Sequence, residues 1–430
     1  MERCNFGCSS CYLTDIANAI EPLPFDEVKE QLDVLRRHLG PSGKTQITSG
    51  EVTLLSPEEL GRIVSYSHEI GLEPMVMTNG ERFLDVPDYL PRLVAEHGLS
   101  KVAIHIDTTQ DGRKGMSATA TESDIVDIRD RFADLIRDVR RMTSRRLDAA
   151  QTVTVTRENL EEIASVTRWT LKNADAFRLL SFQPSAPVGR TRDETTDDLT
   201  LDAVWKRVCE GVGLPLNRDA LRFGHRECNI ICPVVVVTCG AKRRVVESVR
   251  RDNAWDLRIV RRILDTFGDL VVAGSTRVEL ALKVLSLLAR TPTLLLEAPA
   301  YAFYRLWGIR SWLGAALLRL TSLRISPFAI VVHKFMGAEE LDTPLGRERL
   351  AACSFKVPVN GAMVSMCEMN ATGLRLELNE ASGYKRERPQ YGSASRESFS
   401  LNSGHEKALA GPPDRAVPGV AAGGSRSRVR

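Results

Sequence analysis

Three cysteines stand close together near the start of the chain, in the stretch CNFGCSSC that runs from Cys4 through Cys8 to Cys11. Thiolates can each bind one iron of a [4Fe–4S] cluster, and three of them leave the fourth iron without a protein ligand. A structural zinc site normally requires four protein ligands, often as two C-x2-C pairs with a long gap. The C-x3-C-x2-C spacing therefore favours an iron–sulfur cluster with one open iron. A zinc site or three unrelated cysteines are the alternative.

The composition fits a globular protein of a reducing compartment. The chain has 430 residues, of which 43% are hydrophobic and 26% charged, enough for two or three domains. Nine cysteines without an apolar leader argue against a disulfide framework and predict a cytoplasmic location. A net charge of +3 and basic clusters without interleaved aromatics do not require nucleic acid. Charged residues interrupt the apolar stretch 280–335, so we expect no transmembrane span.

Elements that could position the cysteines follow directly behind them. Short apolar runs alternate with helical patterns through the first 190 residues, which predicts a parallel sheet, open or closed into a barrel. Apolar residues at Phe25, Val28, Leu32 and Leu35 mark the buried face of the first helix. The predicted strands are 45–48, 74–78, 102–106, 152–156 and 178–182, with helices near 25–38, 56–70, 86–97, 121–144 and 158–171.

The rest of the chain alternates less regularly. After a polar loop at 190–200 come a stretch with Cys209, Cys228, Cys232 and Cys239, long amphipathic helical patterns, and a predicted β-hairpin with an Asn-Gly turn at 360–361. From residue 382 the composition predicts a disordered tail. We therefore expect a core at 1–195, a C-terminal α+β region at 200–378 and a tail at 382–430.

The cysteine triplet and the alternation behind it resemble the radical SAM superfamily. The stretch ITSGEVTL (47–54) is similar to that family's Gly-Gly-Glu turn, with Ser49 in place of the first glycine. The resemblance implies a partial (β/α)6 TIM-like barrel whose first strand ends just before Cys4. Only three residues precede Cys4, so we expect a barrel that lacks this strand, and we hypothesise that Met1 is not the native start. The stretches MVMTNG (75–80), HIDTTQ (105–110), TVTVTRENLEEI (152–163) and RLLSFQPSAPVGRT (178–191) resemble the third to sixth strands and the segments that follow them.

The resemblance also implies a site. Cys4, Cys8 and Cys11 would hold the [4Fe–4S] cluster, and S-adenosylmethionine (SAM) would bind its open iron. Reductive cleavage of SAM would give a 5′-deoxyadenosyl radical that abstracts hydrogen from a substrate, with the cofactors supplying the chemistry. An electron donor such as ferredoxin or flavodoxin is implied. The SAM-contacting residues would be Ser49, Gly50 and Glu51 at the methionine end, and Asp107, Asn159, Gln183 and Arg190 elsewhere in the pocket. The family often has an aromatic residue before the third cysteine; here that position is Ser10, and the aromatic is Tyr12.

The late cysteines suggest a second cluster. The predicted hairpin would bring Cys353 and Cys367 together, which resembles the start of a SPASM-like auxiliary-cluster module. No cysteine follows Cys367, so further ligands would come from Cys228, Cys232 or Cys239. We favour Cys228, Cys353 and Cys367, with the fourth ligand open; buried structural cysteines are the alternative, as we expect for Cys209.

The substrate is less well indicated. The stretch GHREC (224–228) together with the late cysteine pair resembles tetraether-lipid synthases, which would imply a lipid or other apolar substrate and carbon–carbon bond formation. The apolar stretch 280–335 fits a lipid groove or a membrane surface, or simply helices that pack on the barrel. Two other functions stay open: a non-catalytic iron–sulfur or zinc protein that scaffolds a partner, and an electron-transfer protein without affinity for SAM.

Overall fold

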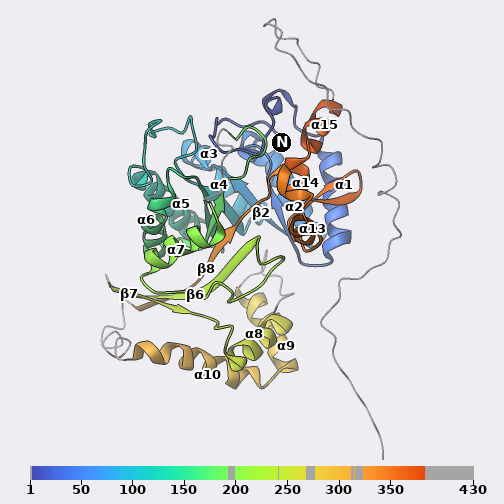
Figure 1. The fold of residues 1–430 in the computed structure, drawn as a ribbon. Coiled ribbons are helices and arrows are strands. Elements are labelled where there is room, and N and C mark those ends of the chain that lie inside the picture. The colour runs from blue at the N-terminus through green and yellow to red at the C-terminus, as the bar shows by residue number, and fades with distance from the viewer. Residues whose placement is uncertain are drawn as a thin grey trace, which may run out of the picture. The chain divides into compact units, whose positions relative to one another are not determined.

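The computed structural model describes residues 2–191, 199–240, 242–267, 277–310, 314 and 323–382 (Figure 1). A mixed sheet of eight strands has the order β1-β2-β3-β4-β5-β8-β6-β7. Neighbours from β1 to β5 and on to β8 pair in parallel, whereas β6 is antiparallel to both β8 and β7. The strands are β1 (Gly43–Ile47), β2 (Leu72–Thr78), β3 (Lys101–His105), β4 (Asp148–Val155), β5 (Phe177–Pro184), β6 (Asn229–Cys239), β7 (Lys242–Glu247) and β8 (Leu323–His333).

Helices connect the parallel strands, which confirms the predicted alternating α/β architecture of a partial TIM-like barrel. Leu32 of the first helix packs with Ile63 and Leu72, and the other apolar residues of its predicted face are partly buried beside them. Ser56 and Glu59 form a capping box at the start of the second helix. These helices are α1 (Phe25–Leu39), α2 (Pro57–Glu69), α3 (Glu81–Asp85), α4 (Tyr89–Ala95), α5 (Val126–Thr143), α6 (Ile163–Lys172) and α7 (Leu201–Val212).

The C-terminal half adds strands to the same sheet, which the sequence pattern did not predict. We expected helical patterns between the cysteine-rich stretch and the late cysteine pair, yet β7 and β8 lie there. The β-branched run at 330–332 suits a buried strand. The helices of this half are α8 (Ala254–Phe267), α9 (Arg277–Arg290), α10 (Leu294–Leu306), α12 (Ala338–Leu341), α13 (Pro344–Ala351), α14 (Met366–Ala371) and α15 (Leu374–Ala381).

A separate two-stranded hairpin lies between the late cysteines, Cys353 and Cys367. Strands β9 (Lys356–Val359) and β10 (Ala362–Ser365) pair antiparallel. Asn360 and Gly361 between them have φ values of 48° and 81°, as a type I′ turn requires. This confirms the predicted hairpin. The domain boundaries stay a prediction; residues 192–198 of the polar loop and 383–430 of the predicted tail lie outside the described residues.

Helices α9 and α10 turn apolar stripes toward solvent. Leu296 and Phe303 of α10 and Trp307, which directly follows this helix, are 80, 63 and 50% exposed, and their spacing places them on one face. The opposite face of α10 is anchored to the chain after β7, where the Tyr301 hydroxyl donates to the Ser248 carbonyl. In the parts of the chain described here, no helix has the length and apolar character needed to cross a bilayer.

Candidate functional site

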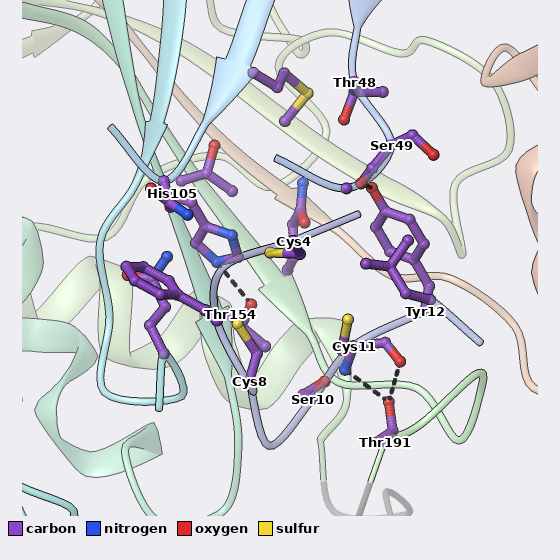
Figure 2. Close-up of a pocket in the computed structure, with 18 of the residues that line it drawn as sticks. Cys4, Cys8, Ser10, Cys11, Tyr12, Thr48, Ser49, His105, Thr154 and Thr191 are labelled. Atoms are coloured by element: carbon purple, nitrogen blue, oxygen red, sulfur yellow. Dashed lines mark hydrogen bonds between the residues drawn. The ribbon is translucent and has the colours of Figure 1, made fainter. Parts of the chain in front are cut away.

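The cysteine triplet lies on a loop, residues 4–12, that is held against the carboxyl ends of parallel strands (Figure 2). After β3, the Thr109 carbonyl accepts a hydrogen bond from Ser9 N at 2.9 Å. After β5, Arg190 N donates to the Cys11 carbonyl at 3.0 Å. Barrel-like α/β enzymes build their sites at this edge of the sheet, so the fold places the three thiols where chemistry is expected. We call residues 4–12 the Cys loop.

All three thiols of the Cys loop line one cavity of about 160 Å³, which we call the first cavity. Figure 2 shows Cys4 and Cys8 beside His105 and Thr154 on two neighbouring strands, and Cys11 beside Thr191. Of the predicted SAM contacts, Ser49, Gly50, Glu51 and Gln183 also line it. Lining residues that we did not predict include Tyr12, Thr48, Thr78, Asn79, His105 and Thr154.

The donor set fits an iron–sulfur cluster better than a single ion. Within the described ranges, no three His, Cys, Asp or Glu side chains converge closely enough to share one metal ion. A cubane does not need such convergence, because each thiolate binds a different iron. Burial raises the pKa of both Cys4 and Cys8, and the neighbouring Cys11 thiol raises it further. Metal binding would therefore release protons from these thiols.

The turn after β1 explains the Ser-Gly sequence of its motif. Ser49 has a φ of 146°, a conformation that favours glycine, and its hydroxyl bonds the Glu2 carboxylate. Position 50 has no room for a side chain, because a Cβ on Gly50 would lie 2.1 Å from the Arg3 carbonyl oxygen. The chain just before the Cys loop therefore packs directly on the backbone of this turn.

Glu51 fixes that turn to the next one. Its Oε1 accepts from Thr53 N at 2.9 Å, the Thr53 hydroxyl at 2.6 Å and the Thr78 hydroxyl at 2.5 Å. Its Oε2 accepts from Asn79 N at 2.7 Å. The side chain is almost fully buried although the residue lines the first cavity. Glu51 thus joins the ends of β1 and β2 beneath the Cys loop.

Three predicted contacts, Asp107, Asn159 and Arg190, lie outside the lining of the first cavity. Asp107 is fully buried and accepts hydrogen bonds from Thr109 and from Thr154 N at 2.6 Å. Asn159 accepts from Thr156 N at 2.9 Å and donates to the Glu122 carboxylate at 2.8 Å. The side chains of Asp107 and Asn159 hold the ends of strands in place.

His105 is one of the cavity residues that sequence reasoning missed. Its Nε2 lies 2.6 Å from Asp107 Oδ2 and 2.9 Å from the Thr154 hydroxyl. Burial alone would raise the pKa of Asp107, but the attraction of His105 and hydrogen bonds from His105, Thr109 and Thr154 lower it to about 2. The sequence did offer a signal for His105. It lies two residues before Asp107, and residues i and i+2 of a strand share a face.

Two further side chains brace the Cys loop. Arg190 does not line the first cavity; its Nη2 donates to the Phe6 carbonyl at 3.1 Å. Tyr12 does line it and donates its hydroxyl to the Ser49 carbonyl at 2.5 Å. The Arg375 guanidinium lies 4.9 Å from the centre of the Tyr12 ring.

Comparison with known proteins agrees with this arrangement. Residues 1–169 match the family model described as the radical SAM superfamily. The chain carries a radical SAM domain. Over 198 residues it is 25% identical to 7,8-dihydro-6-hydroxymethylpterin dimethyltransferase of Methanocaldococcus jannaschii. The aligned residues make up 45% of this chain and 36% of that protein. The chain thus spans about a third of the length of this relative.

Solved structures show only a distant likeness. The structure of anSMEcpe with bound AdoMet has a TM-score of 0.32 at 13% identity and covers 43% of this chain and 49% of that one. Streptococcus suis SuiB has a TM-score of 0.34 at 14% identity and covers 49% of this chain and 44% of that one. Similarity this low says nothing about substrate.

Outside the radical SAM domain, Cys228, Cys353 and Cys367 line a second, smaller cavity of about 10 Å³. Cys228 Sγ accepts from Arg349 Nε at 3.2 Å, and Cys367 Sγ accepts from Met336 N at 3.4 Å. The structure therefore brings together the three cysteines favoured from the sequence. Cys232 is instead buried in the main core, and Cys239 ends β6 at the hairpin with β7.

We predict that Gly50→Ala destabilises the protein by about 1–3 kcal/mol, because the new methyl group must displace the backbone of residues 2 and 3. Urea unfolding measures the effect. Gly308→Ala is the matched control, since a Cβ there meets no atom within 4 Å. Equal stability of Gly50→Ala and the wild type would contradict the close packing of the turn.

We predict that Asp107→Asn costs about 1–3 kcal/mol at neutral pH, because its amide would face backbone and side-chain donors. The folded-state pKa of Asp107, about 2, lies below its ordinary value of 3.8. Its charge therefore stabilises the wild type above about pH 4, and this stabilisation is lost as the pH falls toward 2. The difference in unfolding free energy between Asp107→Asn and the wild type should therefore narrow as the pH falls from about 4 toward 2. The half-exposed Asp138 provides the control substitution Asp138→Asn, and a pH-independent difference would refute the assignment.

Proposed function

We propose that this protein is a radical SAM enzyme that holds a [4Fe–4S] cluster at Cys4, Cys8 and Cys11. The observation that carries the proposal is the placement of three thiols around one cavity at the carboxyl ends of the parallel strands. A three-thiol site leaves one iron for a ligand other than protein. The radical SAM domain implies that this ligand is SAM.

When bound and reduced, the cluster would supply one electron to the sulfonium of SAM, which would give methionine and a 5′-deoxyadenosyl radical able to abstract hydrogen from the substrate. The protein's part is to position and shield these groups. The Cys loop supplies the thiolates. Backbone contacts at Thr109 and Arg190 fix the loop.

The turn at Ser49, Gly50 and Glu51 is the proposed binding site for the methionine end of SAM. Since the Glu51 carboxylate already accepts four hydrogen bonds, its first role is to set the shape of the turn. Gln183 lines the first cavity and can contact the nucleoside part. Asp107, Asn159 and Arg190 act as positioning residues, because the structure places them behind the lining.

A second iron–sulfur cluster at Cys228, Cys353 and Cys367 is part of the proposal. The three cysteines line the second cavity together, and three thiolates can each bind a separate iron of one cluster. Burial raises the pKa of Cys353 and raises that of Cys367 to about 11. The hairpin that follows Cys353 and leads to Cys367 is only partly buried, so it can adjust to a cluster.

The remaining assignments rest on the sequence. A ferredoxin or flavodoxin would donate the electron, in the cytoplasm, and the overall reaction would be that of an oxidoreductase. The substrate would be a small molecule or a lipid. The exposed apolar stripe of α10, with Phe303 and the adjacent Trp307, supports an apolar partner.

We predict that the protein, reconstituted anaerobically with iron and sulfide, forms 5′-deoxyadenosine from SAM and dithionite, whereas Cys8→Ala forms none above background. Chromatography measures the product. Cys209→Ala is the matched control, because Cys209 lies on α7 and lines neither cavity. A protein that binds about four irons at the Cys loop yet yields no product would favour the non-catalytic or electron-transfer alternative.

We predict that the reconstituted wild type holds about eight irons per chain and Cys353→Ala about four, because each cubane contains four. Iron and acid-labile sulfide assays measure the loss. Cys239→Ala, at the far end of β6, should leave the iron content unchanged. Equal iron in Cys353→Ala and the wild type would remove the second cluster from the proposal.

A further inference from the structure

The second cavity contains a buried imidazole with one nitrogen unused. His333 ends β8 and lines this cavity together with the three cysteines. Only 6% of the residue is exposed, and its Nε2 has no hydrogen-bond partner anywhere in the described part of the chain. A buried polar atom without a hydrogen-bond partner destabilises the folded protein, so the unpaired Nε2 needs a physical explanation.

The neighbours of His333 fix its tautomer. Asn229 donates its amide nitrogen to the Phe223 carbonyl at 2.9 Å, which turns its amide oxygen toward the ring. That oxygen contacts His333 Nδ1, so Nδ1 carries the proton. The lone pair of the imidazole therefore lies on Nε2. Metal-binding histidines are typically held in this way, with the other ring nitrogen donating to an oxygen.

Two phenylalanine rings pack against the imidazole of His333 and hold it in place. Phe335 packs edge-on at 4.5 Å between ring centres, and Phe355 packs tilted at 4.2 Å. Both residues also line the second cavity. The ring of His333 is therefore confined beside the three thiols, and its lone pair is sheltered within the protein.

The other histidine of this cavity has a different hydrogen-bond pattern. His225 Nδ1 accepts from Glu227 N at 3.2 Å, so its proton lies on Nε2. That nitrogen lies 4.0 Å from the Glu348 carboxylate. His225 thus presents no free lone pair, although the GHREC stretch makes it the more conspicuous residue in the sequence.

We infer that His333 is the fourth protein ligand, through Nε2, of the second iron–sulfur cluster. The inference rests on the second cluster proposed above and supplies the ligand that the sequence left open. A neutral imidazole in place of a fourth thiolate makes the cluster less negative. Histidine ligation raises the reduction potential of iron–sulfur centres, so this cluster accepts electrons more readily than one with four cysteines.

Nitrogen ligation can be tested without catalysis. A full-length variant with Cys4, Cys8 and Cys11 all changed to alanine isolates the second cluster. It is reconstituted with iron and sulfide, reduced without SAM, and examined by pulsed electron paramagnetic resonance. We expect a strong ¹⁴N coupling that is lost on adding His333→Gln and kept on adding His225→Gln. His333→Cys should keep the iron, lose the coupling and lower the reduction potential, which separates ligation from a folding defect.

The possible outcomes distinguish a wrong assignment of His333 from the absence of the second cluster. Coupling that survives His333→Gln, or vanishes in His225→Gln, overturns the assignment of His333. A cluster without strong ¹⁴N coupling in the triple-alanine protein overturns it as well, while leaving the second cluster in place. If the triple-alanine protein binds no iron but the wild type binds about four, the second cluster itself is refuted, and the inference with it.

Discussion

The buried carboxylate of Glu51 is the interaction on which the candidate site depends. Its two oxygens accept from Thr53, Thr78 and Asn79 and so tie together the turns after β1 and β2. Its backbone nitrogen donates to the Arg3 carbonyl at 2.7 Å, one residue before Cys4. A buried carboxylate that accepts this many hydrogen bonds holds the donating groups firmly in position. The Cys loop therefore starts from a point that the sheet itself fixes.

The sequence was sufficient to predict the N-terminal half of the fold. Phe25, Val28, Leu32 and Leu35 follow the helical period, and α1 packs that face on α2 and β2. The C-terminal strands escaped prediction for a physical reason. Residues 230–237 of β6 form a continuous apolar run although mainly alternate residues are fully buried, and periodicity cannot separate such a run from a buried helix. The hairpin β9–β10 was found because its Asn-Gly turn is a local signal.

The site was predictable only where spacing carried the information. The cysteine triplet lies within one loop, so its spacing alone predicted a shared cavity. The roles of Asp107, Asn159 and Arg190 depend on which atoms happen to face them, and the structure turns each toward a strand end or loop carbonyl. His333 could not be singled out, because its neighbour Asn229 is distant in sequence and the register of β6 on β8 brings the two together.

The C-terminal residues complete the first cavity as well as the second. Arg375 of α15 is buried, donates to Glu2 Oε1 at 2.7 Å and to the Ser49 hydroxyl at 3.2 Å, and covers the Tyr12 ring. It thereby supports the strained Ser49 conformation from the far end of the described chain. Phe335 lines both cavities, so the two thiol clusters are neighbours separated by a packed aromatic side chain. The same C-terminal segment that gathers the late cysteines therefore also braces the turn beside the Cys loop.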